Sequence, residues 1–281
     1  MINEQLQKKI DRAIRLLQAY DDKEHPIEIA YSGGKDSDVI LQLAKEAGIK
    51  YRAIYKNTTI DPPGTIKHAK EMGAEVVRPK ETFFQIIARA GFPNRNRRIC
   101  CDVLKEYQYD PSLQKVIMGV RKSESTARAK RYDEPTKCRG TKEKPYEAIY
   151  PLLDWFNDDV EAFILDRKIK CAPHYYDEDG NFHVERRLGC MACPLVYYKR
   201  RIEVFKKNPR LVRAYIRAGK KYIETHPDSE IAEKYKDVWA YFFRNLYCDA
   251  EWKFERYDKS LFGRPDYKAF LEKQFGIDLT L

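Results

Sequence analysis

The chain has 281 residues, of which 43% are hydrophobic and 13% aromatic, and this composition excludes an intrinsically disordered protein. No apolar run approaches the length of a membrane-spanning helix, so we expect no membrane partner. The net charge of +10 favours phosphate-rich partners, although charge alone does not separate a nucleotide from a nucleic acid.

The first half of the chain alternates short apolar stretches with amphipathic ones, after a charged, helix-patterned segment at residues 1–20. Strands are predicted at 27–32, 51–56, 74–78, 115–120 and 148–152. Helices are predicted at 36–47, 63–72, 82–90, 98–107 and 123–130. This alternation predicts an α/β fold with a doubly wound, mostly parallel sheet that binds ligands at the carboxyl ends of its strands.

The strand pattern fades in the second half, where helices are predicted at 157–167, 195–206, 209–224, 229–246 and 265–274. We therefore expect an α/β domain over residues 1–153 and a helical C-terminal region over residues 154–281. The polar segment 132–145, bounded by prolines, is predicted to be a flexible loop.

The N-terminal segment lacks the apolar stretch of a signal peptide, so we expect a cytoplasmic protein. In that reducing compartment its seven cysteines are expected to be metal ligands, catalytic thiols or core residues rather than disulfides.

A hexapeptide with the composition of a phosphate-binding loop follows the first predicted strand and opens a predicted helix. Its residues are Ser32, Gly33, Gly34, Lys35, Asp36 and Ser37. Glycines let main-chain N–H groups approach an anion, and the helix directs its positive end to the same place. The segment lacks the Walker spacing, because no glycine stands five residues before Gly34. It indicates nucleotide binding more strongly than an ordinary strand-to-helix turn.

Four cysteines form two pairs, the adjacent Cys100 and Cys101 and the CxxC residues Cys190 and Cys193. Two such pairs can supply four thiolates to zinc or to an iron-sulfur cluster. Adjacent thiolates fit poorly on one tetrahedral ion, whereas in a cubane they can bind different irons, so we expect a 4Fe-4S cluster, with zinc as the weaker alternative. The remaining alternative is that the four cysteines are small buried residues without a metal.

The hexapeptide resembles the SGGxDS loop of the PP-loop (N-type) ATP pyrophosphatases, which split ATP between the α and β phosphates. Segments 98–105, 119–128 and 151–160 resemble the R-x-C-x-x-x-L-K, G-x-R-x-x-E-S-x-x-R and P-L-x-x-W-x-x-x-D-V motifs of the phosphoadenylylsulfate (PAPS) reductase family. The cysteine pairs resemble the 4Fe-4S ligands of its adenylylsulfate reductases. The chain is thus identified as a member of this family, whose sheet is HUP-like.

The resemblance implies that the loop holds the pyrophosphate of ATP, with Asp36 near its magnesium ion. Arg121 and Arg128 would bind phosphate or sulfonyl oxygens. Cys138 is a candidate catalytic thiol or persulfide carrier, because its polar segment supplies the cationic neighbours Lys137 and Arg139. An inert thiol is the alternative for Cys138, as it is for Cys171.

Two departures from the reductases bear on the activity. Their catalytic tail cysteine is missing, since no cysteine follows Cys248, whereas the phosphate loop is intact. We therefore expect an ATP-dependent enzyme that adenylates an acceptor for sulfur transfer. The alternatives are a sulfonucleotide (APS or PAPS) reductase and a nucleic-acid-associated module that binds nucleotide without turnover. The first reading implies a sulfur donor or reductant protein and a tRNA or DNA acceptor.

Basic residues recur at spacings of three and four along one predicted helical stretch. They are Lys206, Lys207, Arg210, Arg213, Arg217, Lys220 and Lys221. This cationic face is either a nucleic-acid contact or a solvated surface.

Overall fold

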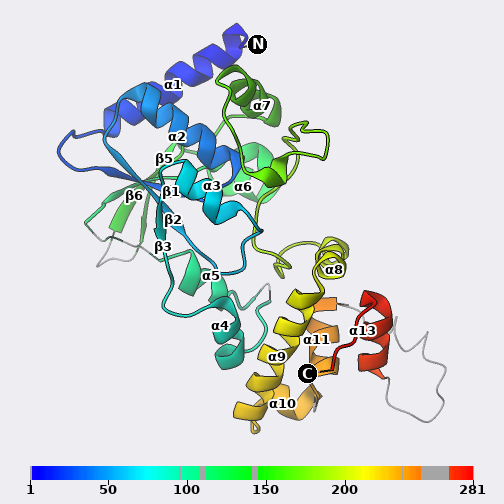
Figure 1. Ribbon diagram of the computed structural model, residues 1–281. Helices are drawn as coiled ribbons and strands as arrows, with labels where there is room; N and C mark the ends of the chain where they lie inside the picture. The colour runs from blue at the N-terminus through cyan, green and yellow to red at the C-terminus, as the bar shows by residue number, and fades with distance from the viewer. Residues whose placement is uncertain are drawn as a thin grey trace. The chain divides into compact units, whose positions relative to one another are not determined.

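The computed structural model describes residues 2–94, 96–107, 110, 112–140, 145–235, 237–247 and 266–280. The chain forms two compact units (Figure 1). The sheet unit comprises Met1–Asn57, Asp61–Arg78 and Gln108–Gly189, and the helical unit comprises Thr58–Ile60, Pro79–Tyr107 and Cys190–Leu281. This division does not follow the expected boundary after residue 153. Helix α7 (Asn157–Asp166) packs against α2 in the sheet unit, whereas α4 (Phe83–Ala90) belongs to the helical unit.

The sheet unit contains a six-stranded sheet in the order β3-β2-β1-β4-β6-β5. Its strands are β1 (Ile27–Tyr31), β2 (Tyr51–Lys56), β3 (Glu75–Val77), β4 (Lys115–Ile117), β5 (Thr136–Gly140) and β6 (Pro145–Ile149). All neighbouring strands are parallel except β5, which runs antiparallel to β6. The expected α/β fold with a mostly parallel sheet is therefore confirmed, and β1 lies centrally in it.

The sheet unit also contains helices and short 3-10 turns. They include α1 (Glu4–Tyr20), α2 (Lys35–Ala47), α3 (Thr65–Glu71), α6 (Thr126–Arg131), α7 and the short 3-10 turns η1 (Lys122–Glu124) and η2 (Pro173–Tyr175). Helix α1 buries Leu6, Ile10, Ala13 and Leu17 at spacings of three and four. It packs against α2, whose Val39, Ile40 and Leu43 join the same core.

The segment expected to be a loop at 132–145 instead contains strand β5, so that prediction was wrong. Thr136 to Gly140 pair with β6, with Cys138 opposite Glu147. Strand β6 also begins earlier than expected, at Pro145, where a missing N–H is tolerated at the start of a strand. Hydrogen bonds to a neighbouring strand created this element, and its own residues carry little strand propensity.

The helical unit is built around aromatic side chains. Its helices are α4, α5 (Ile99–Leu104), α8 (Tyr198–Lys207), α9 (Pro209–Thr225), α10 (Glu230–Tyr235), α11 (Val238–Phe242) and α13 (Tyr267–Phe275). The Tyr215 ring is fully buried, with centroids of Phe83, Phe84 and Phe205 each at 5.4 Å. The single helix expected at 229–246 is interrupted, because the Asp237 side chain caps a new start at α11, which continues into the π-helical turn η3 (Phe243–Tyr247).

Among the described residues, none of the helices is both long enough and apolar enough to cross a bilayer.

Close packing between α9 and the chain after α4 makes one glycine a test of this core. A methyl group at Gly219 would lie 2.5 Å from Cζ of Phe92, whose ring stacks on Tyr241. Overpacking costs about 1–3 kcal/mol, whereas alanine normally gains about 1 kcal/mol over glycine in a helix. We expect Gly219→Ala to lower the melting temperature in a thermal unfolding measurement.

The matched control is Gly189→Ala, because nothing lies within 4 Å of a methyl group there. That variant should melt like the wild type. A Gly219→Ala protein that melts at or above the wild-type temperature would contradict this packing.

Candidate anion site and cysteine cavity

The hexapeptide forms a tight turn between β1 and α2, at the carboxyl end of the central strand. Gly33 has a φ of +74°, and a methyl group there would lie 2.9 Å from Cγ2 of Thr65. Gly34 is the N-cap residue of α2, and no side chain caps the helix. The turn therefore needs glycine for its shape, and no side chain forms a capping hydrogen bond at the positive end of α2.

The two serines hold the turn closed. The Ser37 hydroxyl donates to the carbonyl oxygen of Gly34 at 2.7 Å, and the Ser32 and Ser37 hydroxyls lie 3.2 Å apart. The Gly34 N–H donates to Ser32 Oγ at 3.3 Å. Their hydroxyls thus shape the loop, while Ser32 itself is exposed and able to meet a ligand.

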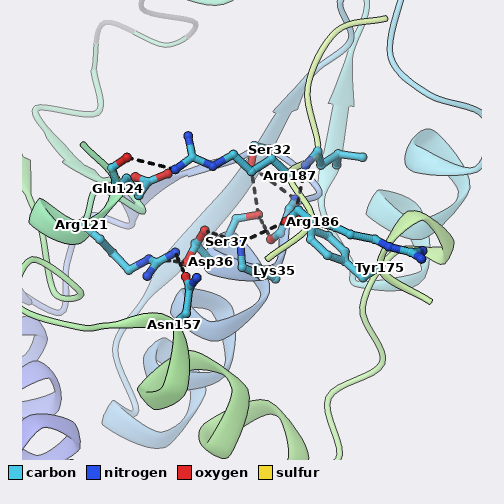
Figure 2. A network of polar contacts seen from close by, with 12 residues as sticks. Ser32, Lys35, Asp36, Ser37, Arg121, Glu124, Asn157, Tyr175, Arg186 and Arg187 are labelled. Carbon is cyan, nitrogen blue, oxygen red and sulfur yellow. Dashed lines mark hydrogen bonds and ion pairs between the residues drawn. The ribbon is translucent and has the colours of Figure 1, made fainter. Parts of the chain in front are cut away.

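Two buried cations share one carboxylate at the start of α2 (Figure 2). Lys35 and Arg121 are 3% and 2% exposed. Lys35 Nζ lies 3.4 Å from Asp36 Oδ2, and Arg121 Nε lies 2.8 Å from Asp36 Oδ1. The second contact is an ion pair without hydrogen-bond alignment. Burial lowers the pKa of Lys35, and the Asp36 carboxylate opposes that shift.

Neighbouring side chains brace this charged group. Arg121 donates to Asn157 Oδ1 on α7 at 3.0 Å and to Ser123 Oγ at 3.3 Å. Arg128 forms an ion pair with Glu124, whose carbonyl oxygen accepts from Arg187 at 3.0 Å. Burial lowers the pKa of Arg128.

The cations at this loop outnumber the carboxylates that pair with them. Lys35, Arg121, Arg128 and Arg187 interact electrostatically with one another, while Asp36 and Glu124 supply the paired negative charge. Together with the uncapped helix start, this arrangement is suited to an anion with several oxygens, such as a phosphate chain. The expected residues 32–37, Arg121 and Arg128 are therefore brought together.

Residues 175–188, which belong to none of the motifs found in the sequence, contact the loop. Lys35 Nζ donates to the carbonyl oxygen of Arg186 at 3.4 Å and lies 5.4 Å from the ring centre of Tyr175 (Figure 2). The Tyr175 hydroxyl accepts from the N–H of Leu188 at 3.3 Å and would touch a methyl group at Gly34 at 3.3 Å. Sequence reasoning missed these residues because they lie far along the chain and carry no recognisable spacing.

A buried polar network around Asp38 holds the first turn of α2 in place. Asp38, fully buried, accepts from the Tyr31 hydroxyl, and its oxygens lie 3.0 and 3.1 Å from His68 Nε2. The Cys171 thiol also contacts this carboxylate, and burial raises the pKa of the thiol. Cys171 is thus a packed thiol, and the network ties the loop helix to β1 and α3.

All four paired cysteines lie in the helical unit and line one cavity. Cys100 and Cys101 come from α5, and Cys190 and Cys193 flank a tight turn. Phe83, Leu104 and Pro194 contribute apolar walls. A hydrogen bond from the Cys100 thiol, with help from Arg98, lowers the pKa of Cys101 to about 6, and the same bond raises that of Cys100.

The CxxC turn is held by the core of the helical unit. The Tyr215 hydroxyl lies 3.5 and 3.4 Å from the carbonyl oxygens of Met191 and Ala192, and the Met191 N–H donates to Ile60 at 2.8 Å. Thr58 Oγ1 is 3.7 Å from Cys190 Sγ. Within the described part of the chain, no three His, Cys, Asp or Glu side chains are arranged as a preformed metal site.

Cys138 lies away from the anion site. In the sheet register, Cys138 on β5 is opposite Glu147 on β6, and Glu147 is opposite Lys115 on β4. The residue after Lys115 is opposite Glu28, so Cys138 is level with the start of β1. The hexapeptide follows the other end of β1, a separation on the order of 15 Å along the strand, with β4 and β6 between. The Arg139 side chain donates to the Tyr150 hydroxyl at 2.6 Å. The exposed Cys138 is therefore not brought to the loop.

Known proteins resemble this chain at the level of family and of fold. A family model for the phosphoadenosine phosphosulfate reductase domain matches residues 26–196. Two uncharacterized proteins of Methanocaldococcus jannaschii are 26% identical over 223 residues and 28% identical over 210 residues. These matches cover 74% and 71% of this chain but 44% and 49% of the relatives, so the chain spans about half their length.

Solved structures with a similar arrangement include three kinds of enzyme. The Candida auris PAPS reductase in a phosphate complex has a TM-score of 0.44 at 14% identity, covering 61% of this chain and 90% of that one. The U34-tRNA thiolase NcsA of Methanococcus maripaludis, with its [4Fe-4S] cluster, has 0.44 at 20%, covering 81% and 82%. A Candida glabrata FMN adenylyltransferase with FMN and an ATP analogue has 0.45 at 15%, covering 61% and 59%.

The family match agrees with the motifs. The hexapeptide, the three further motif segments and both cysteine pairs all lie within the matched residues. Because the model matches more than half of the chain, this protein belongs to the phosphoadenosine phosphosulfate reductase domain family.

Proposed function

We propose that this protein binds Mg-ATP at residues 32–37 and adenylates an oxygen of an acceptor, which sulfur then replaces. One observation carries the proposal: buried Lys35 and Arg121 share the single carboxylate of Asp36 beside the uncapped start of α2. A triphosphate would supply the missing negative charge. The glycine turn would let main-chain N–H groups reach its oxygens.

The proposed chemistry has two steps. The acceptor oxygen attacks the α-phosphorus, the bond to the β-phosphate oxygen breaks, and pyrophosphate leaves with the electron pair. Lys35, Arg121, Arg128 and magnesium, with Asp36 near the ion, would stabilise that leaving charge. A sulfide donor then attacks the activated carbon, the carbon–oxygen bond breaks, and AMP leaves with the original oxygen. A persulfide donor would instead form a disulfide, and two electrons from the reductant protein would cleave that disulfide and leave the sulfur on the acceptor. Adenylation is needed because an unactivated oxygen is a poor leaving group.

We propose that the cysteine cavity holds a 4Fe-4S cluster as a resident cofactor. Cys100, Cys101, Cys190 and Cys193 would hold it, since their thiols line one cavity with apolar walls in a single unit. When bound, such a cluster supplies thiophilic iron and a covalent crosslink between α5 and the CxxC turn. A reducing cytoplasmic setting would suit these thiols, and zinc is the weaker alternative.

The sulfonucleotide reductase alternative requires a nucleophilic cysteine that reaches the nucleotide. Cys138 is exposed on β5, level with the opposite end of β1. Cys248 lies outside the described residues. Cys171 lies near the loop but is buried against Asp38, so neither described cysteine of the sheet unit is both exposed and at the loop.

The first prediction from the proposed function concerns ATP. Lys35→Ala combined with Asp36→Ala should weaken ATP binding in calorimetry and abolish pyrophosphate release, because both side chains meet at the loop. Lys45→Ala is the matched control, since this exposed lysine lies at the other end of α2. Unchanged ATP binding in a folded double variant would remove the assignment.

The same assay separates the alternatives. Pyrophosphate release that requires added RNA or DNA supports adenylation of a nucleic-acid acceptor, whereas ATP binding without release supports a module without turnover. With thioredoxin and either sulfonucleotide, we expect no sulfite. Sulfite production that disappears in Cys138→Ser or in Cys248→Ser would make the reductase reading correct.

The second prediction tests the glycine turn. Gly33→Ala should abolish binding of ATP and of inorganic pyrophosphate. An alanine is strained at the positive φ of this position, and its methyl group would clash with Thr65. Gly48→Ala is a control for the backbone strain alone. Gly48 has a φ of +65°, and no atom lies within 4 Å of a methyl group placed there. This control should lower the melting temperature, by an amount that corresponds to about 1–2 kcal/mol, and retain nucleotide binding. Equal nucleotide affinity in both variants would contradict this role of the turn.

The third prediction concerns the cysteines. Anaerobically purified protein should be brown and contain iron and acid-labile sulfide, and Cys190→Ser or Cys101→Ser should lose both. Cys138→Ser, which removes an exposed thiol from the other unit, should keep them. Stoichiometric zinc without iron after anaerobic reconstitution would reject the cluster.

A further inference from the structure

A cavity of about 400 Å³ lies in the helical unit and has no role in the chemistry described above. Pro194, the residue after the CxxC, lines both this cavity and the cysteine cavity, so the two share a wall. The other lining residues that matter here are Asn94, Asn96, Arg97, Tyr197, Tyr198 and Arg201. Amides, aromatic rings and guanidinium groups thus meet around one space.

The rings and one amide of the cavity are available to a ligand. Tyr197 is 59% exposed, and its ring centre lies 4.8 Å from that of Tyr198. Asn94 Oδ1 accepts from the N–H groups of Asn96 and Arg97, each at 2.9 Å, and so shapes the turn. The Asn96 side-chain amide has no hydrogen-bond partner among the described residues. It therefore offers a donor and an acceptor at the rim.

The wall of the cavity is braced. Arg201 is 3% exposed, and its Nε donates to the carbonyl oxygen of Leu246 at 2.6 Å while Nη1 donates to that of Pro194 at 3.2 Å. These bonds tie α8 to the chain after the CxxC and to η3. The cavity is consequently held open by the fold, as preformed ligand sites are.

The helices that follow the cavity carry a strong positive charge. Between Lys199 and Lys221 the chain has ten Lys and Arg residues and one acidic residue, Glu203. Within the described structure, seven exposed cations of this stretch form no ion pair: Lys199, Arg200, Lys206, Lys207, Arg210, Arg217 and Lys221. The cationic face predicted from the sequence is thus largely exposed, and only Arg213 turns its guanidinium to a backbone carbonyl, that of Asp278.

We infer that this cavity receives an unpaired nucleobase of a single-stranded nucleic acid. The base would stack on the Tyr197 ring and meet the Asn96 amide with its edge, while the phosphates follow the basic residues of α8 and α9. Base stacking on aromatic side chains beside a cationic track is the usual means of holding single strands. The inference concerns binding alone and does not depend on ATP chemistry in the sheet unit.

Fluorescence anisotropy of labelled oligonucleotides, with the full chain and without ATP, tests it. The probes are an unstructured RNA, a DNA strand of the same sequence, the blunt duplex and an abasic strand of equal length. Both single strands should bind more tightly than the duplex and the abasic strand. Tyr197→Ala should weaken binding to base-containing strands by about five-fold or more and leave the abasic strand unaffected.

Two controls separate stacking from charge and from folding. Phe156→Ala removes a ring of similar exposure, 60%, from the other unit and should bind like the wild type. Lys206→Ala with Lys207→Ala should weaken binding to every probe and reduce the salt slope by about one for each phosphate that these lysines neutralise.

Tighter binding of either the RNA or the DNA strand shows which nucleic acid supplies the base, and both results support the inference. Equal affinity for abasic and base-containing strands, tighter binding of the duplex, or wild-type affinity in a folded Tyr197→Ala protein would each overturn it.

Discussion

The shared carboxylate of Asp36 is the interaction on which the rest of the sheet unit depends. Removing an ammonium and a guanidinium from water costs several kcal/mol per ion unless the protein supplies compensating partners. Lys35 and Arg121 obtain them from Asp36, from Asn157 and from the backbone of the covering segment. Because these partners come from α2, α7 and residues near Arg186, the elements of the unit converge on this charge. The remaining positive charge is available for an anion.

The family motifs acquire distinct physical roles in this arrangement. Gly119 permits the chain after β4 to approach α2, because a methyl group there would lie 3.3 Å from Cβ of Asp36. That approach brings Arg121, two residues later, to the carboxylate. In the third motif, the carbonyl oxygen of the buried Trp155 accepts from the Ser123 hydroxyl at 2.8 Å, and Asp159 accepts from the N–H of Phe156 at 2.7 Å. This motif therefore positions α7 and its Asn157 rather than a reacting group.

Each unit of the chain collects residues from distant parts of the sequence for one kind of chemistry. The sheet unit gathers the cations, and the helical unit gathers both cysteine pairs, although about ninety residues separate them. Tyr215 contributes both to the core of the helical unit and to the cysteine cavity. Its ring packs in the aromatic core, and its hydroxyl contacts the backbone of the CxxC turn. The packing that stabilises this unit is thus also the packing that shapes the cysteine cavity.

Local patterns in the sequence determined the central elements and the loop. Strands β1 and β2, helix α2 and the glycine turn depend on apolar spacing and on residues adjacent in the chain, so they could be predicted. Tertiary structure alone decided that β5 exists, that Tyr175 and Arg186 cover the loop, and that Asp38 pairs with His68. It also placed Cys138 at the far end of the sheet. The physical reason is that strand pairing, burial and electrostatic contact join residues far apart in the chain, and no local periodicity records such contacts.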